Sequence, residues 1–384
     1  MKPKIVLSLT HSKDNPRNSE GAFINLADGR IMFAYSRYRG NNWHDHGAAD
    51  IAARFSSDGG ETWSKHPRIL IPNEGRCNVM SVSLLNLTDG RIALFYLRKN
   101  SHLDCRLWMR VSEDNAGSWS EPTLCIPAPG YFVVNNDRVI ALRDGRLLVP
   151  AAYHRPRLPA GEPLEQALDG RGVVLIYYSD DGGQNWQEAR DWAVLPIPSQ
   201  SGLQEPGVVE LRNGEIYGWA RTDCGVQWEM RSADRGETWS PPIASPFRSP
   251  CSPMSMKRIP HTGELLAVWN EPPGPGDGTP DTTGTEREEE NRTWGRTPLV
   301  VALSNDEGRS WHTKKIVEND PERGFCYTAI HFSDDCLLLA YCCGGKHSVV
   351  LQDSRITKIS LAWLYDKNVS LVKKVKTITG NAPV

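Results

Sequence analysis

The chain reads SSDGGETWS over residues 56–64, and the same pattern of serine, aspartate, glycine and tryptophan returns four more times. The other copies are SEDNAGSW (112–119), SDDGGQNW (179–186), SADRGETW (232–239) and SNDEGRSW (304–311). All five share Ser-x-Asp with a Trp seven residues after the Ser, and four of the five have Gly at the fifth position. An internal repeat of this kind indicates an architecture that uses one structural unit several times.

A second repeat consists of apolar runs on either side of a short polar turn. Six such turns lie near residues 28, 89, 144, 213, 262 and 334. Asp-Gly or Asn-Gly between alternating apolar segments is a strong hairpin signal, and a type I′ turn is expected there. In the first five units, a third strand, the Ser-x-Asp turn and a fourth strand follow. The sequence therefore predicts an all-β protein, a six-bladed β-propeller with four-stranded antiparallel blades, as a single domain over residues 1–384.

The repeated Ser-x-Asp turn is predicted to be structural. Its Asp accepts backbone N–H groups of the same turn, its Gly adopts a conformation closed to other residues, and its Trp packs between neighbouring blades. A calcium loop is not predicted, because the second carboxylate and the distal Glu of such loops are missing. The sixth unit lacks the turn, so at least one of the terminal segments 4–10 and 368–378 is expected to pair into it and close the ring.

The bulk composition excludes several classes of function. A formal charge of -2 and a pI near 6.6 give no sign of binding to nucleic acid or to an anionic membrane. No apolar run approaches the ~20 residues that span a bilayer. The nine cysteines show no framework spacing, and no convincing signal peptide precedes them, so reduced thiols in a cytoplasmic protein are expected. No cofactor is predicted, and the oligomeric state is left open.

Strand direction alternates along each blade, and this orients the predicted disc. Hairpins and Ser-x-Asp turns close one face, while the starts of the first strands meet at the central axis of the other face, where a ligand site is expected. The Pro-, Gly- and acid-rich stretch 271–292 is expected to be a mobile rim loop of the fifth blade. The segment from His44 to His46 contains metal-ligand types, but adjacent loop residues rarely converge on one ion, and no metal site is predicted.

These features resemble the sialidase (neuraminidase) superfamily, whose repeated Ser-x-Asp-x-Gly-x-x-Trp turns are known as Asp-boxes (BNR repeats). The likeness covers nearly the whole chain. GLQEPGVVELRNGEIYGWAR (202–221) is similar to the sialidase segment that implies Glu205 as the base activating the nucleophile and Arg221 as a clamp for the sugar carboxylate. GFCYTAIHF (324–332) is similar to the segment of the nucleophilic tyrosine, which implies that role for Tyr327. Asp50, or failing that Asp45, lies in the region of the acid/base.

The resemblance also explains why a tyrosine is used. Sialic acid carries a carboxylate on its anomeric carbon, which repels a carboxylate nucleophile but not a tyrosine. The chain departs from the family at the start of the first blade, where Ser19-Glu20 replaces the Arg-Ile-Pro segment and its clamp arginine. Predicted substrate contacts are Glu20, Arg37, Asp137, Arg138, Arg221 and Arg296.

The function hypothesis is an exo-acting glycoside hydrolase of the sialidase type, with a carbohydrate as its partner. Its substrate is expected to be a terminal sialic-acid-like or other acidic sugar. Two alternatives remain: a glycosidase or lyase for a different sugar that uses paired carboxylates, and a non-catalytic propeller that binds glycans.

Overall fold

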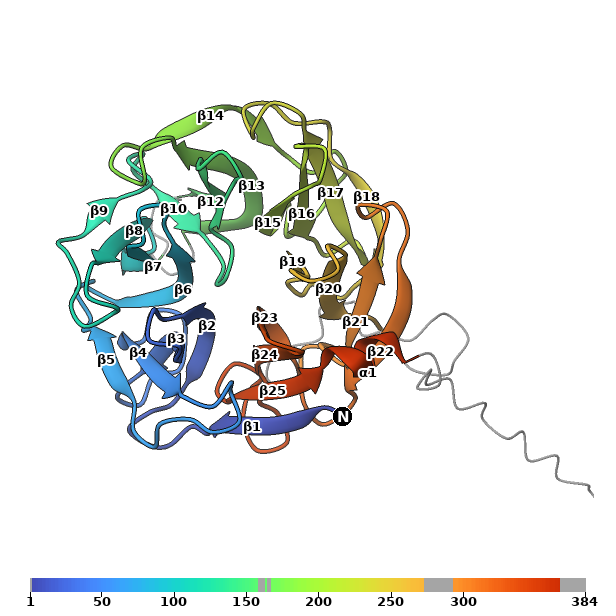
Figure 1. The fold of residues 1–384 in the computed structure, drawn as a ribbon. Coiled ribbons are helices and arrows are strands. Elements are labelled where there is room, and N and C mark those ends of the chain that lie inside the picture. The colour runs from blue at the N-terminus through green and yellow to red at the C-terminus, as the bar shows by residue number, and fades with distance from the viewer. Residues whose placement is uncertain (1, 158–162, 164–166, 273–292, 367–384) are drawn as a thin grey trace, which may run out of the picture.

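The computed structural model describes residues 2–157, 163, 167–272 and 293–366. Over these residues the fold is all-β, with strands β1 to β25 and one five-residue helix, α1 (Leu361–Tyr365). The sheets stand around a common axis in a propeller-like ring (Figure 1). No helix in this described part is long and apolar enough to cross a membrane. The predicted rim loop, from residue 273 onward, and the segment 368–378 lie outside the described residues.

Four sheets of the ring have four strands each. The innermost strand of each is β2, β15, β19 or β23 (Figure 1). One sheet contains β2 (Asn18–Asn25), β3 (Ile31–Tyr38), β4 (Ala49–Ser56) and β5 (Arg68–Ile71). The next two contain β15 (Gln204–Glu210), β16 (Ile216–Arg221), β17 (Val226–Ser232) and β18 (Ile243–Arg248), and β19 (Ser255–Arg258), β20 (Leu265–Asn270), β21 (Leu299–Ser304) and β22 (His312–Glu318). The last contains β23 (Cys326–Ser333), β24 (Cys336–Cys342), β25 (Ser354–Ser360) and β1 (Lys4–Leu9).

A nine-stranded sheet stands where the second and third blades were predicted. One parallel pairing, Tyr131 with Cys105, joins its two halves. The inner strand expected for the third blade is divided into two short strands because residues 134–139 bond to other sheets, as described below. The sheet contains β6 (Asn78–Asn86), β7 (Ile92–Ser101), β8 (Asp104–Ser112), β9 (Thr123–Leu124), β10 (Tyr131–Val133), β11 (Ile140–Ala141), β12 (Leu147–Pro156), β13 (Leu168–Ser179) and β14 (Gln187–Ala193).

The N-terminal strand completes the sheet that holds β23. β1 pairs antiparallel with β25, from Lys4 opposite Lys358 to Leu9 opposite Ser354. Figure 1 shows it lying along the outer side of β25. The prediction that at least one terminal segment pairs into this sheet is confirmed.

The hairpin turns differ in type from the prediction. In the first turn, the N–H of Gly29 donates to the carbonyl of Leu26 (3.0 Å). The N–H of Leu26 donates to the carbonyl of Arg30 (2.8 Å). Only the Gly has a positive φ (85°), whereas a type I′ turn needs two such residues. The turn is instead a type I turn that ends in a glycine bulge. The same bonds recur around Gly90, Gly145 and Gly214.

The Asp-box is held by bonds within the turn itself. In the first box, Ser56 Oγ donates to Asp58 Oδ1 (2.8 Å) and accepts from the N–H of Gly60 (2.9 Å), and the N–H of Thr62 donates to Asp58 Oδ1 (2.9 Å). The hydrogen bonds from Thr62 and Ser56 lower the pKa of Asp58 to about 2. No group of three His, Cys, Asp or Glu side chains in the described ranges is arranged to hold a metal ion. The Asp of the box therefore serves its own turn.

Hairpins of one unit contact the Asp-box of the next unit. The N–H of Ala27 donates to Asn115 Oδ1 (2.8 Å), and the N–H of Arg212 donates to Glu307 Oε2 (2.8 Å). These contacts place hairpins and Asp-boxes on the same face of the ring. The orientation derived from strand alternation agrees with this arrangement.

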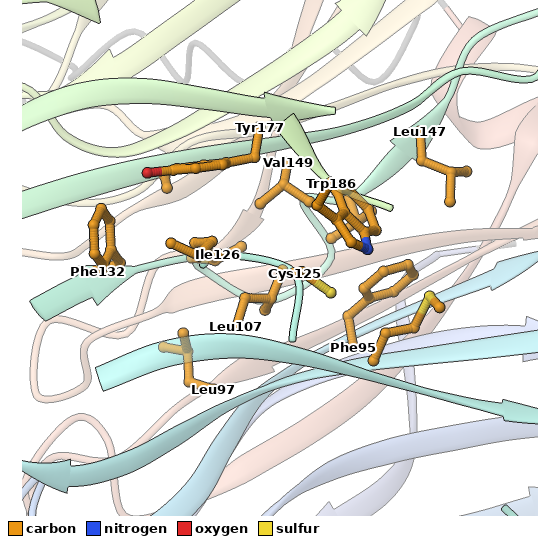
Figure 2. Close-up of a cluster of buried hydrophobic side chains, with 14 of the residues drawn as sticks. Phe95, Leu97, Leu107, Cys125, Ile126, Phe132, Leu147, Val149, Tyr177 and Trp186 are labelled. Atoms are coloured by element: carbon orange, nitrogen blue, oxygen red, sulfur yellow. The ribbon is translucent and has the colours of Figure 1, made fainter. Parts of the chain in front are cut away.

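Apolar side chains fill the space between neighbouring inner and outer strands. Figure 2 shows one such cluster, in which Trp186 of the third Asp-box meets Phe95 of β7 edge-on at 6.1 Å between ring centroids. Trp311 of the fifth box packs on Phe247 of β18, in the neighbouring sheet, at 4.9 Å. The box tryptophans thus help hold adjacent units together.

Candidate functional site

Four innermost strands carry a β-bulge at their cavity end. The register shifts within β2, β6, β15 and β23, and each shift contains a residue other than Gly with a positive φ. These residues are Glu20 (54°), Ser81 (56°), Glu205 (47°) and Tyr327 (57°). Such a conformation costs on the order of 1–3 kcal/mol and persists where surrounding structure enforces it. A bulge turns a side chain that would lie on a sheet face toward another direction, here the axis.

All four bulge residues line one cavity of about 610 Å³ at the centre of the ring. This volume lies in the range of small-molecule sites and exceeds that of one monosaccharide. Its wall also includes Asp45, Lys99, Tyr131, His154, Asp169, Gln204, Arg221, Asp223, Cys251, Trp294 and Arg296.

Tyr327 and Glu205 are joined by a hydrogen bond across the cavity floor. Tyr327 Oη donates to Glu205 Oε1 at 2.9 Å, although the two residues are 122 positions apart in the chain. This distance is that of an ordinary O–H···O hydrogen bond. Burial and then the charge of Glu205 raise the pKa of Tyr327 well above its usual value, while Arg221 and Arg296 act to lower it. The free protein therefore holds a neutral tyrosine beside a carboxylate.

Two arginines flank this pair. Arg221 Nη1 donates to Glu205 Oε2 (2.8 Å), and its Nε donates to Cys251 Sγ (3.2 Å). The Arg296 guanidinium lies 5.6 Å from the centroid of the Tyr327 ring and is only 4% exposed. Its Nη1 donates to Cys326 Sγ (3.2 Å) and its Nη2 to the carbonyl of Cys251 (3.3 Å), while its Nε meets no acceptor among the described residues. We call Glu205, Tyr327, Arg221 and Arg296 the arginine side of the cavity.

The opposite wall is organised by Arg17, which was not predicted. Arg17 is 1% exposed. Its Nη2 lies 2.7 Å from Glu20 Oε2, and its Nη1 lies 2.6 Å from Asp45 Oδ1. Its guanidinium also lies 4.6 Å from the centroid of the Tyr38 ring. One buried cation thus fixes two carboxylates that face the cavity.

Ser81 and Lys99 complete this wall. Ser81 Oγ donates to Glu20 Oε1 (3.1 Å), and Lys99 Nζ donates to the carbonyl of Asp45 (2.9 Å). Burial raises the pKa of Glu20, and this effect outweighs the charge of Arg17, which acts to lower it. We call Glu20, Ser81, Arg17, Asp45 and Lys99 the Glu20 side of the cavity.

Asp50 and Arg37 do not line this cavity. They are paired directly across β3 and β4, so their side chains share one face of that sheet. On that face the Asp50 carboxylate accepts from the N–H of Asn73 (2.8 Å) and lies 3.5 Å from Arg39 Nε. The strand alternation thus directs Asp50 away from the axis. Asp45, the alternative in the same loop, lines the cavity with its side chain 57% exposed.

Asp137 and Arg138 tie the sheets together instead of facing the cavity. Asp137 accepts from Lys257 Nζ (2.6 Å) and from the N–H of Ile330 (3.0 Å). Arg138 is 2% exposed, and its Nη2 donates to the carbonyl of Met254 (2.6 Å). Both line a second hollow of about 470 Å³.

The adjacent Asn136 shows why this segment leaves the strand pattern. Its Nδ2 donates to the carbonyls of Gly21 (2.7 Å) and Tyr327 (3.1 Å), on two other sheets. A run of polar residues at the axis therefore satisfies backbone groups of neighbouring strands. Burial lowers the pKa of Arg138 to about 10.

Several residues in the cavity wall or directly behind it were not predicted from the sequence. Arg17 precedes a polar inner strand that was itself recognised, so its position two residues before Ser19 was the available signal. Cys251 and Trp294 lie outside regular strands, and their motifs carry no general signature. Ser81 could have been found by aligning the four inner strands on their bulges, but a bulge leaves no clear mark in one sequence.

Residues 42–339 match the family of BNR repeat-like domains. The chain is 29% identical over 195 residues to a sialidase of Vibrio cholerae, covering 44% of this chain and 23% of that protein. It is 27% identical over 242 residues to a sialidase of Clostridium perfringens, covering 56% and 58%. The match to an anhydrosialidase of Macrobdella decora is 25% over 327 residues, covering 79% and 38%.

The chain spans less than two thirds of the length of each of these relatives. Solved structures resemble it over more of its length. A protein of unknown function from Dyadobacter fermentans has a TM-score of 0.69 at 16% identity, covering 93% of this chain and 99% of its own. The Hadza microbial sialidase Hz136 has a TM-score of 0.65 at 18% identity, covering 90% and 66%. At these identities the likeness establishes the fold.

Proposed function

Because the chain belongs to the family of BNR repeat-like domains and to the sialidase superfamily, we propose that it is an exo-acting glycoside hydrolase of the sialidase type. The proposal rests on one observation above all, the 2.9 Å hydrogen bond from Tyr327 to Glu205 inside a cavity that Arg221 and Arg296 also line. Relatives at low identity that are named sialidases support it.

In this proposal Tyr327 is the nucleophile and Glu205 its base. Tyr327 is neutral in the free protein, so it meets a substrate carboxylate without repulsion. As Tyr327 Oη attacks the anomeric carbon, its proton passes to Glu205 Oε1 and the bond to the departing alcohol breaks. Arg221 and Arg296 bind the substrate carboxylate through paired N–H donors. The substrate is then a terminal acidic sugar.

Asp45 takes the acid/base role that the sequence assigned first to Asp50. It stands at the cavity wall with an exposed carboxylate, where a departing group meets solvent. The charges of Arg17 and Lys99 outweigh the opposing effect of desolvation and lower the pKa of Asp45. Its ionised form is the one that activates water in the second step. A leaving group that needs little protonation is therefore favoured in the first step.

We also infer six blades in one domain. The nine-stranded sheet counts as two blades, β6 to β9 and β10 to β14, whose strands pair with each other through Tyr131 and Cys105. Together with the four separate sheets, this gives the predicted number.

The test is a hydrolysis screen on aryl glycosides, because a phenol leaves without strong acid assistance. The panel contains aryl glycosides of sialic acids, of uronic acids and of neutral sugars, assayed with the unmodified protein and with Glu205→Gln. Turnover of an acidic glycoside that Glu205→Gln abolishes is the expected result. Turnover of only the neutral glycosides would contradict the proposal.

A second candidate is a glycosidase that uses paired carboxylates. Glu20 and Glu205 line the same cavity from different sheets, which is the arrangement such a mechanism needs. It predicts that Tyr327→Phe keeps its activity, whereas the tyrosine mechanism predicts a loss.

A further inference from the structure

We propose that Glu20 gives the cavity a hydroxyl-binding side, so that an acidic sugar binds with its carboxylate at Arg221 and Arg296 and with one of its hydroxyl groups donating to Glu20. This inference rests on the proposed function and specifies its substrate. The ligand class is an acidic sugar with a free hydroxyl at the edge of the ring opposite its carboxylate.

The backbone aims Glu20 as it aims the proposed catalytic pair. Glu20, Glu205 and Tyr327 all sit at bulges with φ between 47° and 57°. Glu20 is 6% exposed, and that small area opens into the cavity. A glutamate that only filled space would not need a left-handed backbone at the axis.

The contacts of Glu20 leave one acceptor position open. Its Oε2 accepts from Arg17 Nη2 (2.7 Å) and Ser19 Oγ (2.9 Å). Within the described part of the chain, its Oε1 accepts from Ser81 Oγ alone (3.1 Å). A carboxylate oxygen has two lone pairs, so Oε1 can accept one more hydrogen bond. The ion pair with Arg17 holds the group in place, and a fixed, charged acceptor binds a hydroxyl more strongly than a neutral one does.

The balance of charge decides where the substrate carboxylate goes. On the Glu20 side, Arg17 pairs with the carboxylates of both Glu20 and Asp45, and Lys99 Nζ donates to the backbone carbonyl of Asp45, so two cations stand beside two carboxylates. On the arginine side, two guanidinium groups share one carboxylate, Glu205. Arg296 Nη1 and Nη2 donate to Cys326 Sγ (3.2 Å) and to the carbonyl of Cys251 (3.3 Å), and among the described residues neither bonds a carboxylate. An anionic group is therefore attracted to the arginine side and repelled by Glu20.

The two walls together define the orientation of the sugar. A site built around a buried hydrogen-bond acceptor rejects an analogue without the matching hydroxyl, because the acceptor is then left unpaired. Glu20 thus replaces one carboxylate contact with one hydroxyl contact. The same residue should exclude sugars that carry a sulfate or phosphate at that edge.

The experiment measures binding and does not depend on turnover. Isothermal titration calorimetry gives the Kd of 2-deoxy-2,3-didehydro-N-acetylneuraminic acid and of its single-deoxy analogues. The proteins are the unmodified chain, Glu20→Gln, and the matched control Asp28→Asn, whose carboxylate lies on the hairpin face and bonds Arg30. Gln keeps one oxygen, which can accept from Arg17, and its NH2 group can donate to the Ser81 hydroxyl, so a folded variant is expected, and circular dichroism checks this.

The parent ligand should bind Glu20→Gln about tenfold more weakly, and Asp28→Asn as well as the unmodified chain. One deoxy analogue should bind the unmodified chain about tenfold more weakly and be insensitive to Glu20→Gln, because the contact is already absent. If the parent ligand bound Glu20→Gln more tightly than the unmodified chain, the carboxylate of the ligand would lie next to Glu20, and the inference would be overturned. The inference would also be overturned if every deoxy analogue lost affinity for the unmodified chain to the same extent. This second comparison does not need the variant, so it remains possible if Glu20→Gln fails to fold.

The proposed function fails in a different way. Acidic ligands that bind and respond to Glu20, with no acidic aryl glycoside turned over, would refute the hydrolase and keep the inference. Turnover of an acidic glycoside, without any effect of Glu20→Gln on ligand binding, would support the hydrolase and refute the inference. If no acidic sugar binds at all, both are refuted.

Discussion

The cavity pair Tyr327–Glu205 has a close counterpart outside the cavity, Tyr341–Glu318. Tyr341 Oη donates to Glu318 Oε1 at 2.6 Å, and Arg355 Nη1 lies 3.0 Å from the same oxygen. Burial, and then the neighbouring glutamate, raises the pKa of Tyr341 well above its usual value, as at Tyr327. Residue types and pKa directions are the same at both places, and the two tyrosine–glutamate hydrogen bonds are similar in length, 2.9 Å and 2.6 Å.

The two pairs differ in backbone and in surroundings. Tyr341 lies on a regular part of β24, 23 residues from Glu318, and Thr357 takes part in its hydrogen bonding. Tyr327 and Glu205 are 122 residues apart, sit at bulges and face an open cavity. A tyrosine–glutamate pair is therefore not itself evidence of catalysis, since this fold also uses such pairs to connect strands. The cavity and the bulges make the difference.

Tyr327→Phe should show the largest effect. The proposed nucleophile is lost, so kcat/KM on an acidic aryl glycoside should fall by about 10³-fold or more, on the order of 4 kcal/mol in the transition state. Tyr341→Phe is the matched control, because it also removes one hydroxyl from a Tyr–Glu pair, and it should retain kcat/KM. Steady-state kinetics on both variants measures the contrast.

Near-normal turnover by Tyr327→Phe would break the comparison. The two pairs would then be equally structural, and the carboxylates of Glu20 and Glu205 would carry the chemistry.

The arginines of the two pairs give a second contrast. Arg221→Lys keeps the charge next to Glu205 but loses the planar fork that binds a carboxylate at two points, so kcat/KM should fall by about 10²-fold. Arg355→Lys makes the same change next to Glu318 and should leave kcat/KM unaltered. If both variants kept full activity, Arg221 would be no more than a structural partner of Glu205.

These contrasts also show what the sequence alone could predict. The repeats were sufficient for an all-β propeller and for a structural Asp-box, because Ser56, Asp58 and Gly60 act within a few residues of one another. The likeness of two segments to sialidases indicated Glu205, Arg221 and Tyr327, and Arg296 was predicted separately as a substrate contact. All four line one cavity.

The remaining site residues depend on long-range contacts that no local pattern encodes. Asp137 and Arg138 were expected in the site, but their partners Lys257 and Met254 lie more than a hundred positions away. Asp50 was preferred to Asp45, yet Asp50 lies within β4 opposite Arg37 of β3, whereas Asp45 lies in the loop before β4 and lines the cavity. Arg17 matters because Glu20 and Asp45 meet it, and this meeting is a product of the fold.

A third test concerns His331, at the opposite end of strand β23 from Tyr327. We expect this residue to affect the stability of the fold and not the activity. His331 stacks on Phe23, with centroids 5.5 Å apart, and burial lowers its pKa to about 4 from the usual 6.5. The folded state thus favours the neutral ring, and the unfolded state binds more protons between these values. Stability should therefore fall as the pH drops from about 6.5 to 4, and His331→Gln should remove about 2 kcal/mol of this loss.

Denaturant unfolding at pH 7 and pH 4.5 measures the change. His261→Gln, at an exposed position, serves as the control and should leave the pH dependence as it is. If His331→Gln showed the same loss between the two pH values as the unmodified chain, the half-buried His331 ring would not be its source.

The smallest expected effect is on stability, where Tyr341→Phe should be affected more than Tyr327→Phe, the opposite of their order in activity. Tyr341→Phe deletes a buried hydroxyl and leaves Glu318 and Thr357 each without one partner, so it should lower the free energy of unfolding by about 1 kcal/mol. Tyr327→Phe should leave stability unchanged or slightly raise it, because functional positions are rarely optimised for stability. Denaturant melts of the two variants, beside their kcat/KM values, should therefore give a crossed result. Tyr341→Phe loses stability and keeps activity, and Tyr327→Phe loses activity and keeps stability. If Tyr327→Phe were the more destabilised variant, its hydrogen bond to Glu205 would belong with the strand-connecting pairs, and the cavity alone would no longer distinguish the two.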